Sequence, residues 1–175
     1  MSISKLVLEL SDTIPDFPKP GIVFRDLTPV FADADGFRAV IDDIASRFSG
    51  RFDAVAGVEA RGFLLAAGLA YAAHVPLAAV RKAGKLPGEV LSEDYALEYG
   101  TATLEIRPGQ LAAGSRVLIV DDILATGGSC TAAARLVERS GYSVAGIGLM
   151  LELQGLGGRE RLAGYDLYAI VAEPA

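Results

Sequence analysis

Residues 117–129 read Val-Leu-Ile-Val-Asp-Asp-Ile-Leu-Ala-Thr-Gly-Gly-Ser, and no other stretch of the chain is as informative. The apolar run predicts a buried strand, expected over Arg116 to Val120, that ends in the carboxylates Asp121 and Asp122. A glycine turn then leads into an Ala-rich helix, predicted over Thr126 to Ser140 and ended by Gly141. A buried strand that turns tightly into a helix is typical of α/β proteins.

The glycine turn predicts an anion site at the end of this strand. Small residues let backbone N–H groups approach a phosphate closely, and the helix start adds oriented donors. The spacing matches neither a Walker A loop nor a dinucleotide-binding glycine fingerprint. Two carboxylates beside a phosphate repel it unless they bind hydroxyl groups or lie near a cation, and a phosphorylated sugar with magnesium meets both conditions. The alternative is that Asp121 and Asp122 only end the strand and cap the helix.

The alternation of strands and helices continues on both sides of this stretch. It predicts an α/β fold with a central, mostly parallel sheet flanked by helices, in a single domain spanning residues 1–175. The remaining strands are expected at Asp53–Val58, Pro76–Val80, Val144–Leu151 and Leu167–Val171, and the remaining helices at Phe37–Phe48, Gly62–Ala73 and Arg159–Leu162.

Two other parts of the chain depart from this alternation. Helical spacing over Ile3–Leu10 is followed by Pro15, Pro18 and Pro20, which predicts a short helix and then an extended loop. Residues 82–92 are polar and contain Gly and Pro, which predicts a long loop that moves. The alternating residues 95–106 predict an antiparallel hairpin beside that loop.

Composition excludes several classes of function. The 175 residues carry a formal net charge of −6, and cationic side chains gather only at Arg81, Lys82 and Lys85, so we expect no nucleic-acid or anionic-membrane partner. The single Cys130 predicts a structural thiol in a reducing compartment and excludes a metal site of the Cys and His type. With no signal peptide and no apolar run of about 18 residues, the expected location is the cytoplasm.

Residues 117–129 resemble the 5-phosphoribosyl 1-pyrophosphate (PRPP) motif of the type I phosphoribosyltransferases. Four further segments resemble the members of that family that act on adenine. They are Phe-Pro-Lys-Pro-Gly-Ile-Val-Phe-Arg-Asp at 17–26, Glu-Ala-Arg-Gly-Phe at 59–63, Arg-Lys-Ala-Gly-Lys-Leu-Pro-Gly at 81–88 and Leu-Glu-Tyr-Gly at 97–100. The resemblance runs from about Pro15 to the last predicted strand.

The resemblance implies a role in purine salvage, in which the phosphoribosyl group of PRPP is transferred to adenine to give AMP and pyrophosphate. It also implies a Mg²⁺ ion held mainly by substrate and water rather than directly by the protein, and a homodimer. Residues 1–30 would form a hood over the base, and residues 82–106 a flexible loop and hairpin. The alternatives are transfer to another purine base or a regulator that senses PRPP without catalysis.

The resemblance also assigns site residues. The 5′-phosphate would be held by Ala125, Thr126, Gly127, Gly128 and Ser129, and the ribose hydroxyls by Asp121 and Asp122. Pyrophosphate would be bound by Glu59, Ala60, Arg61, Arg81, Lys82 and Lys85.

Adenine would be stacked between Phe24 and Leu153, with the backbone of Val23 and Arg25 reading its polar edge. Glu98 would manage the proton on the imidazole side of the base, with Tyr99 beside it in the hairpin. The alternatives are that Phe24 and Leu153 are core residues, that the loop cations are a solvated face and that Glu98 is an exposed hairpin residue.

Overall fold

The computed structural model describes residues 1–97 and 100–175 and is built on a seven-stranded sheet of order β5-β6-β4-β3-β7-β8-β9. Strands β4, β3, β7, β8 and β9 are parallel, and β6 and β5 continue the sheet antiparallel at one edge. The predicted α/β class and mostly parallel sheet are confirmed.

The elements are α1 (Ile3–Leu10), β1 (Asp12–Pro15), β2 (Val23–Asp26), α2 (Thr28–Ala32), α3 (Ala34–Arg47), β3 (Ala54–Val58), α4 (Gly62–Ala73), β4 (Leu77–Lys82), β5 (Leu91–Ala96), β6 (Thr101–Ile106), β7 (Arg116–Leu124), α5 (Gly128–Arg139), β8 (Ser143–Gln154), α6 (Gly158–Arg161) and β9 (Leu167–Pro174).

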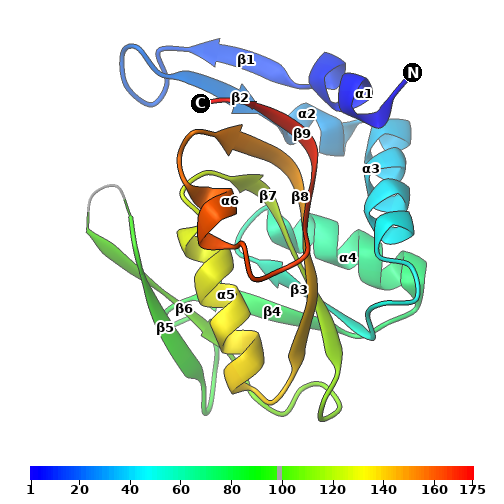
Figure 1. Ribbon diagram of the computed structural model, residues 1–175, viewed down its shortest axis with the longest axis vertical. Coiled ribbons are helices and arrows are strands. Elements are labelled where there is room, and N and C mark those ends of the chain that lie inside the picture. The colour runs from blue at the N-terminus through cyan, green and yellow to red at the C-terminus, as the bar shows by residue number, and fades with distance from the viewer. Residues whose placement is uncertain (98–99) are drawn as a thin grey trace.

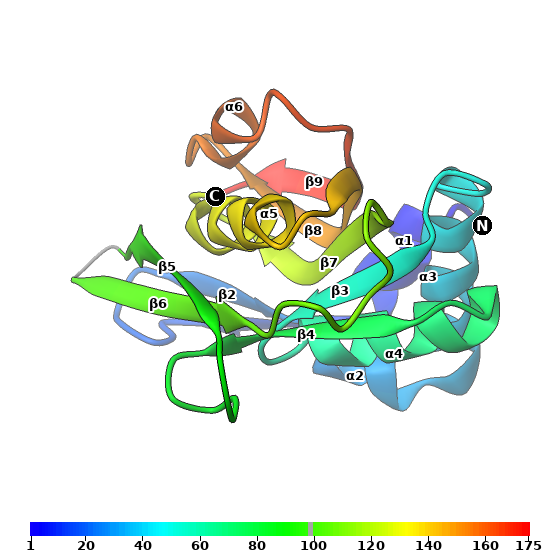
Figure 2. The same ribbon diagram turned by 90° about the horizontal axis from the view of Figure 1, so that it is seen from below.

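Two apolar cores cover the two faces of the sheet, because side chains alternate along each strand. In β3, Ala54, Ala56 and Val58 face the core that contains α5, whereas Val55 faces the core that contains α1 to α4. Figure 2 shows α5 on one side of the strands and α3 and α4 on the other. Helices packed on both faces hold the strands in place, and the site is built from the ends of these strands.

The strand order reverses its direction at β3. The chain passes from β3 through α4 to β4 on one side, whereas β7 lies on the other side of β3 and leads through α5 to β8. The loops after β3 and β7 therefore diverge and leave a crevice at the carboxyl ends of these two strands, where open α/β sheets bind ligands. Glu59 to Arg61 and residues 125–127 lie in these two loops.

The structure corrects several sequence-based boundaries. The proline-containing segment is not simply an extended loop, because β1 and β2 pair as a separate antiparallel hairpin that lies across the end of β9 (Figure 1). The short helix α2 was not predicted. The long loop ends earlier than expected, since β5 begins at Leu91. Strand β7 also continues through Asp121 and Asp122, because β8 pairs with it as far as Leu124.

Candidate active site

A cavity of 790 Å³ opens at the carboxyl ends of β3 and β7. Its lining includes every residue predicted to hold the 5′-phosphate or the ribose, and four of the six predicted to bind pyrophosphate. These residues are Glu59, Ala60, Arg61, Lys82, Asp121, Asp122, Ala125, Thr126, Gly127, Gly128 and Ser129. The two predicted pyrophosphate residues outside the lining, Arg81 and Lys85, contact the Glu59 side chain.

The turn before α5 has the geometry of an anion site. Gly127 has a φ of 78°, and no side chain caps the helix that begins at Gly128, so the first N–H groups of α5 lack intrahelical acceptors. A Cβ at Gly127 would lie 3.0 Å from the carbonyl oxygen of Gly158 and 3.1 Å from its Cα. Only glycine combines the positive φ with this close approach of two backbones.

Asp121 and Asp122 are both buried at the floor of the cavity, with exposed fractions of 8% and 5%. The backbone N–H of Asp122 donates to Asp121 Oδ1 at 2.9 Å. Burial raises the pKa of Asp121 well above its ordinary value, and the neighbouring Asp122 raises it further. Burial also raises the pKa of Asp122, against the opposing effect of the Arg61 guanidinium, whose Nε lies 2.5 Å from Asp122 Oδ2.

The Glu59 side chain contacts three basic residues next to the cavity. Its Oε1 accepts a hydrogen bond from Lys85 Nζ at 2.6 Å, and its Oε2 accepts one from the Lys82 N–H at 2.9 Å. Arg81 Nε lies 3.5 Å from Oε2. The hydrogen bond from Lys85 lowers the pKa of Glu59, so the carboxylate stays ionised and holds the side chains of Lys85 and Arg81 and the backbone of Lys82 next to the cavity.

Two buried polar atoms at this site are held by ion pairs and not by aligned hydrogen bonds. Within residues 1–97 and 100–175, the buried side-chain atoms that lack a hydrogen-bond partner are Arg81 Nε and Asp122 Oδ2. Arg81 Nε lies 3.5 Å from Glu59 Oε2, and Asp122 Oδ2 lies 2.5 Å from Arg61 Nε. Their partners, Glu59 and Arg61, line the cavity, so a bound ligand can compete with these ion pairs.

A second cavity, of 690 Å³, adjoins the first and contains the residues predicted to bind the base. Val23, Phe24 and Arg25 line it from β2, and Leu153 lines it from β8. Arg61, Ile123 and Ala125 line both cavities. The anion turn and the mainly apolar base cavity are therefore two ends of one continuous surface.

Comparison with known proteins gives the family. The model of the phosphoribosyl transferase domain family matches residues 32–162. An adenine phosphoribosyltransferase from Clavibacter sepedonicus is 67% identical over 171 residues, which are 98% of this chain and 89% of that protein. One from Arthrobacter sp. is 59% identical over 97% of this chain and 91% of its own length.

The chain belongs to the adenine phosphoribosyltransferase family.

Solved structures of the family agree with this fold. The adenine phosphoribosyltransferase of Thermoanaerobacter pseudethanolicus is 48% identical and superimposes with a TM-score of 0.91, covering 97% of this chain and 99% of its own. That of Saccharomyces cerevisiae, solved with an imino-altritol bisphosphate and adenine, is 38% identical with a TM-score of 0.90, covering 96% of this chain and 98% of its own.

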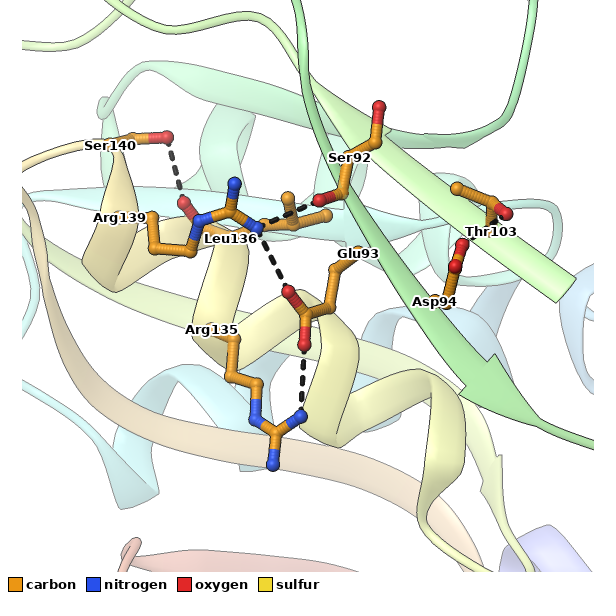
Figure 3. A network of polar contacts seen from close by, with 8 residues as sticks. All are labelled: Ser92, Glu93, Asp94, Thr103, Arg135, Leu136, Arg139 and Ser140. Carbon is orange, nitrogen blue, oxygen red and sulfur yellow. Dashed lines mark hydrogen bonds and ion pairs between the residues drawn. The ribbon is translucent and has the colours of Figure 1, made fainter. Parts of the chain in front are cut away.

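The β5–β6 hairpin of this family member forms another wall of the larger cavity, through Tyr95, Ala96 and Leu97. Figure 3 shows how it is anchored. Glu93 on β5 accepts hydrogen bonds from Arg135 at 2.9 Å and from Arg139 at 2.8 Å, and both arginines lie on α5. The helix that starts at the anion turn therefore also holds the hairpin. The predicted residues Glu98 and Tyr99 follow Leu97 in the sequence but lie outside the described residues.

Sequence reasoning missed several residues of the site. Ile123 lines both cavities, Leu156 lines the larger one, and Glu173 lines the base cavity from β9. Glu173 contacts Arg25 across 148 residues, so no local pattern could indicate it. The hairpin is anchored by Glu93, Arg135 and Arg139. Their pairing could not be predicted from the sequence, because it depends on the packing of β5 against α5.

Cys130 is buried in α5, and burial raises the pKa of its thiol, as expected of a structural cysteine. Within the part of the chain that the structure describes, none of the helices has the length and apolar character needed to cross a bilayer.

Replacing Asp121 by Asn should stabilise the protein by an amount that grows with pH. The pKa of Asp121 is higher in the folded chain than its ordinary value of 3.8, which applies to the unfolded chain. The free energy of unfolding is therefore largest below pH 3.8 and decreases as pH rises towards the folded-state pKa, because the buried carboxyl group must then ionise. Asn removes that loss and keeps an oxygen for the Asp122 N–H. Each pH unit between the two pKa values is worth about 1.4 kcal/mol. Each kcal/mol raises the Tm of a domain this size by about 2–4 °C.

Thermal unfolding of both proteins between pH 4 and pH 8 measures this difference. The Tm of Asp121→Asn should exceed that of the unmodified chain by a margin that widens as pH increases. A constant or shrinking margin would show that Asp121 carries no buried-charge penalty.

Proposed function

We propose that this chain transfers the phosphoribosyl group of PRPP to N9 of adenine, releasing pyrophosphate and giving AMP for purine salvage. The observation that carries the proposal is the continuity of the two cavities through Arg61, Ile123 and Ala125. A nucleotide can place its phosphate on the turn at 125–129 while its base lies between Phe24 and Leu153. The family membership supports the same reaction.

The larger cavity supplies the groups that PRPP requires. N–H groups of the turn bind the 5′-phosphate, and the carboxylates of Asp121 and Asp122 accept hydrogen bonds from the ribose hydroxyls. Ribose hydroxyls and neighbouring cations stabilise the ionised acidic pair and so offset the cost of its burial. Arg61 lines both cavities, which supports a role for it beside C1′ and the departing pyrophosphate.

Pyrophosphate departure creates negative charge that the loop cations are placed to stabilise. The bond between C1′ and the pyrophosphate oxygen breaks as the C1′–N9 bond forms, with positive charge developing on the ribose. Arg81 and Lys85, held at the rim by Glu59, can exchange this carboxylate for pyrophosphate oxygens when the loop at 83–90 closes. Closure also excludes water, which would otherwise hydrolyse PRPP.

The base cavity supplies recognition and the hairpin supplies proton transfer. Backbone groups of Val23 and Arg25 read the polar edge of adenine, and Phe24 and Leu153 cover its faces. A purine with a different donor and acceptor pattern leaves such fixed groups unpaired, which costs binding free energy. Glu98 is the proposed acceptor of the N9 proton, and Tyr99 is its neighbour in the sequence.

A Mg²⁺ ion fits this site as a companion of the substrate. The described residues contain no cluster of three or more His, Cys, Asp or Glu side chains that could hold a metal by themselves. The buried Asp122 Oδ2 is already ion-paired with Arg61 Nε at 2.5 Å. Asp121 and Asp122 would thus approach the hydrated ion through water and ribose, and the ion, when bound, neutralises charge on the pyrophosphate.

We also propose that the active form is a homodimer in the cytoplasm. Helix α4 is apolar around its circumference yet exposes Leu64 and Tyr71, the latter with 84% of its surface accessible, and Leu77 on β4 is also exposed. Helices of this kind are normally buried on all sides, so a second copy is the expected cover. The free, buried thiol of Cys130 supports a reducing location.

Pyrophosphate release with a panel of bases tests the proposed function. With PRPP and Mg²⁺ present, adenine should give a kcat/KM at least about 10²-fold above hypoxanthine and guanine. A reaction without base should give almost no release, because water is excluded. Comparable rates with hypoxanthine would assign another purine, and no release with any base would favour a PRPP sensor.

A further inference from the structure

The wall of the base cavity formed by β2 is not part of the main sheet. Strands β1 and β2 form their own two-stranded sheet, separate from the seven-stranded one. The opposite wall, formed by Leu153 on β8, belongs to the seven-stranded sheet. Because the two walls lie on different sheets, the width of the cavity depends on the contacts that join them.

Arg25 makes such a contact. Its Nε donates to Glu173 Oε1 at 2.9 Å and its Nη2 donates to Glu173 Oε2 at 3.0 Å, a two-bond pairing of guanidinium and carboxylate. Its Nη1 also donates to Ser11 Oγ at 3.2 Å. The side chains of Arg25 and Glu173 keep only 22% and 23% of their surface exposed. A parallel pair of bonds from a planar fork fixes orientation as well as distance.

Each partner of this ion pair is adjacent to a residue proposed to cover the base. Arg25 follows Phe24 on β2, and Glu173 on β9 is the register partner of Leu153 on β8. Both charged residues also line the cavity. The distance between the Phe24 wall and the Leu153 wall is therefore tied to the geometry of the Arg25–Glu173 pair (Figure 1 shows β2 next to the end of β9).

We propose that the Arg25–Glu173 ion pair is a positioning clamp that sets the width of the base cavity and thereby the affinity for the purine. This inference rests on the proposed function. It assigns a role to Glu173 and to the Arg25 side chain, in addition to the backbone of Arg25 that reads the base. A pair that served stability alone would change the Tm and leave substrate affinities as they are.

The test uses Arg25→Lys and Glu173→Gln, singly and combined, in the full chain. Each single variant should raise the KM for adenine by about tenfold or more, because a misplaced positioning group can cost up to about 10²-fold. The KM for PRPP should stay within about twofold, since its groups lie in the other cavity. The double variant should be no worse than the poorer single one, because both remove the same clamp.

A matched control is available at the other end of the sheet. Asp53 and Arg116 form a similar pair, with Arg116 Nε donating to Asp53 Oδ2 at 2.9 Å and Nη2 donating to Oδ1 at 2.7 Å. Asp53→Asn should leave both KM values unchanged. An unchanged adenine KM in the clamp variants, an equal rise in the PRPP KM, or additive effects in the double variant would overturn the proposal. If the unmodified chain prefers another base, the proposed substrate is wrong, and the clamp is tested with that base instead.

Discussion

Gly127→Ala is expected to lower kcat/KM for PRPP by at least about 10²-fold, since displacing a substrate-binding group by about 1 Å can cost this much. The new Cβ would lie 3.0 Å from the Gly158 carbonyl oxygen, and the φ of 78° disfavours any residue with a side chain. The turn must shift to accommodate the methyl group, so its N–H groups no longer meet the 5′-phosphate. Steady-state kinetics with varied PRPP measures the loss.

Gly141→Ala is the matched control for this variant. Gly141 lies just beyond the other end of α5, has a φ of 82° and would place a Cβ with no atom within 4 Å. Alanine at position 141 therefore has an unfavourable positive φ, as does alanine at position 127. It makes no steric contact, and it lies away from the cavity. Gly141→Ala should lose no more stability than Gly127→Ala, and it should keep its activity. Equal kinetics for the two variants would show that the turn does not hold the phosphate.

Glu98→Gln is expected to lower kcat by about 10²-fold or more, because general acid or base assistance is typically worth about 10²–10⁴-fold. The amide cannot accept the N9 proton, although glutamine is nearly the same size as glutamate and its amide oxygen can still accept a hydrogen bond. PRPP should still bind, since the acidic pair and the turn at 125–129 are unaffected. Pre-steady-state kinetics separates the chemical step from product release.

Glu9→Gln serves as the control, because Glu9 lies on the exposed face of α1 and pairs with Lys5. It should retain the kcat of the unmodified chain. If Glu98→Gln also retains it, proton removal does not depend on Glu98, and positioning with charge stabilisation must account for the rate.

The sequence was sufficient where local patterns decide the structure. Helices α3, α4 and α5 and the buried strands β3 and β7 follow from the spacing of apolar residues or from uninterrupted apolar runs, and from end signals such as Gly141 after α5. The phosphate and ribose residues were predictable because they are contiguous on one strand and turn. Their roles were assigned from the resemblance, whereas their convergence on one cavity was shown by the structure.

Long-range packing was what the sequence could not supply. The pairing of β1 with β2 around three prolines, the extension of β7 along β8, and the contact of Arg25 with Glu173 all depend on neighbours distant in the chain. The same limit applies to Glu93, which accepts hydrogen bonds from two arginines on α5. Residues that position the substrate-binding groups were therefore harder to predict than the groups themselves.

A crystal structure of the chain with AMP tests most directly whether the two cavities form one nucleotide site. We predict that the phosphate lies on the turn at 125–129, that the ribose hydroxyls meet Asp121 and Asp122, and that adenine lies between Phe24 and Leu153. An AMP phosphate bound elsewhere at saturating concentration, or a base outside the cavity lined by Val23 and Glu173, would contradict the proposed transfer of phosphoribose to adenine.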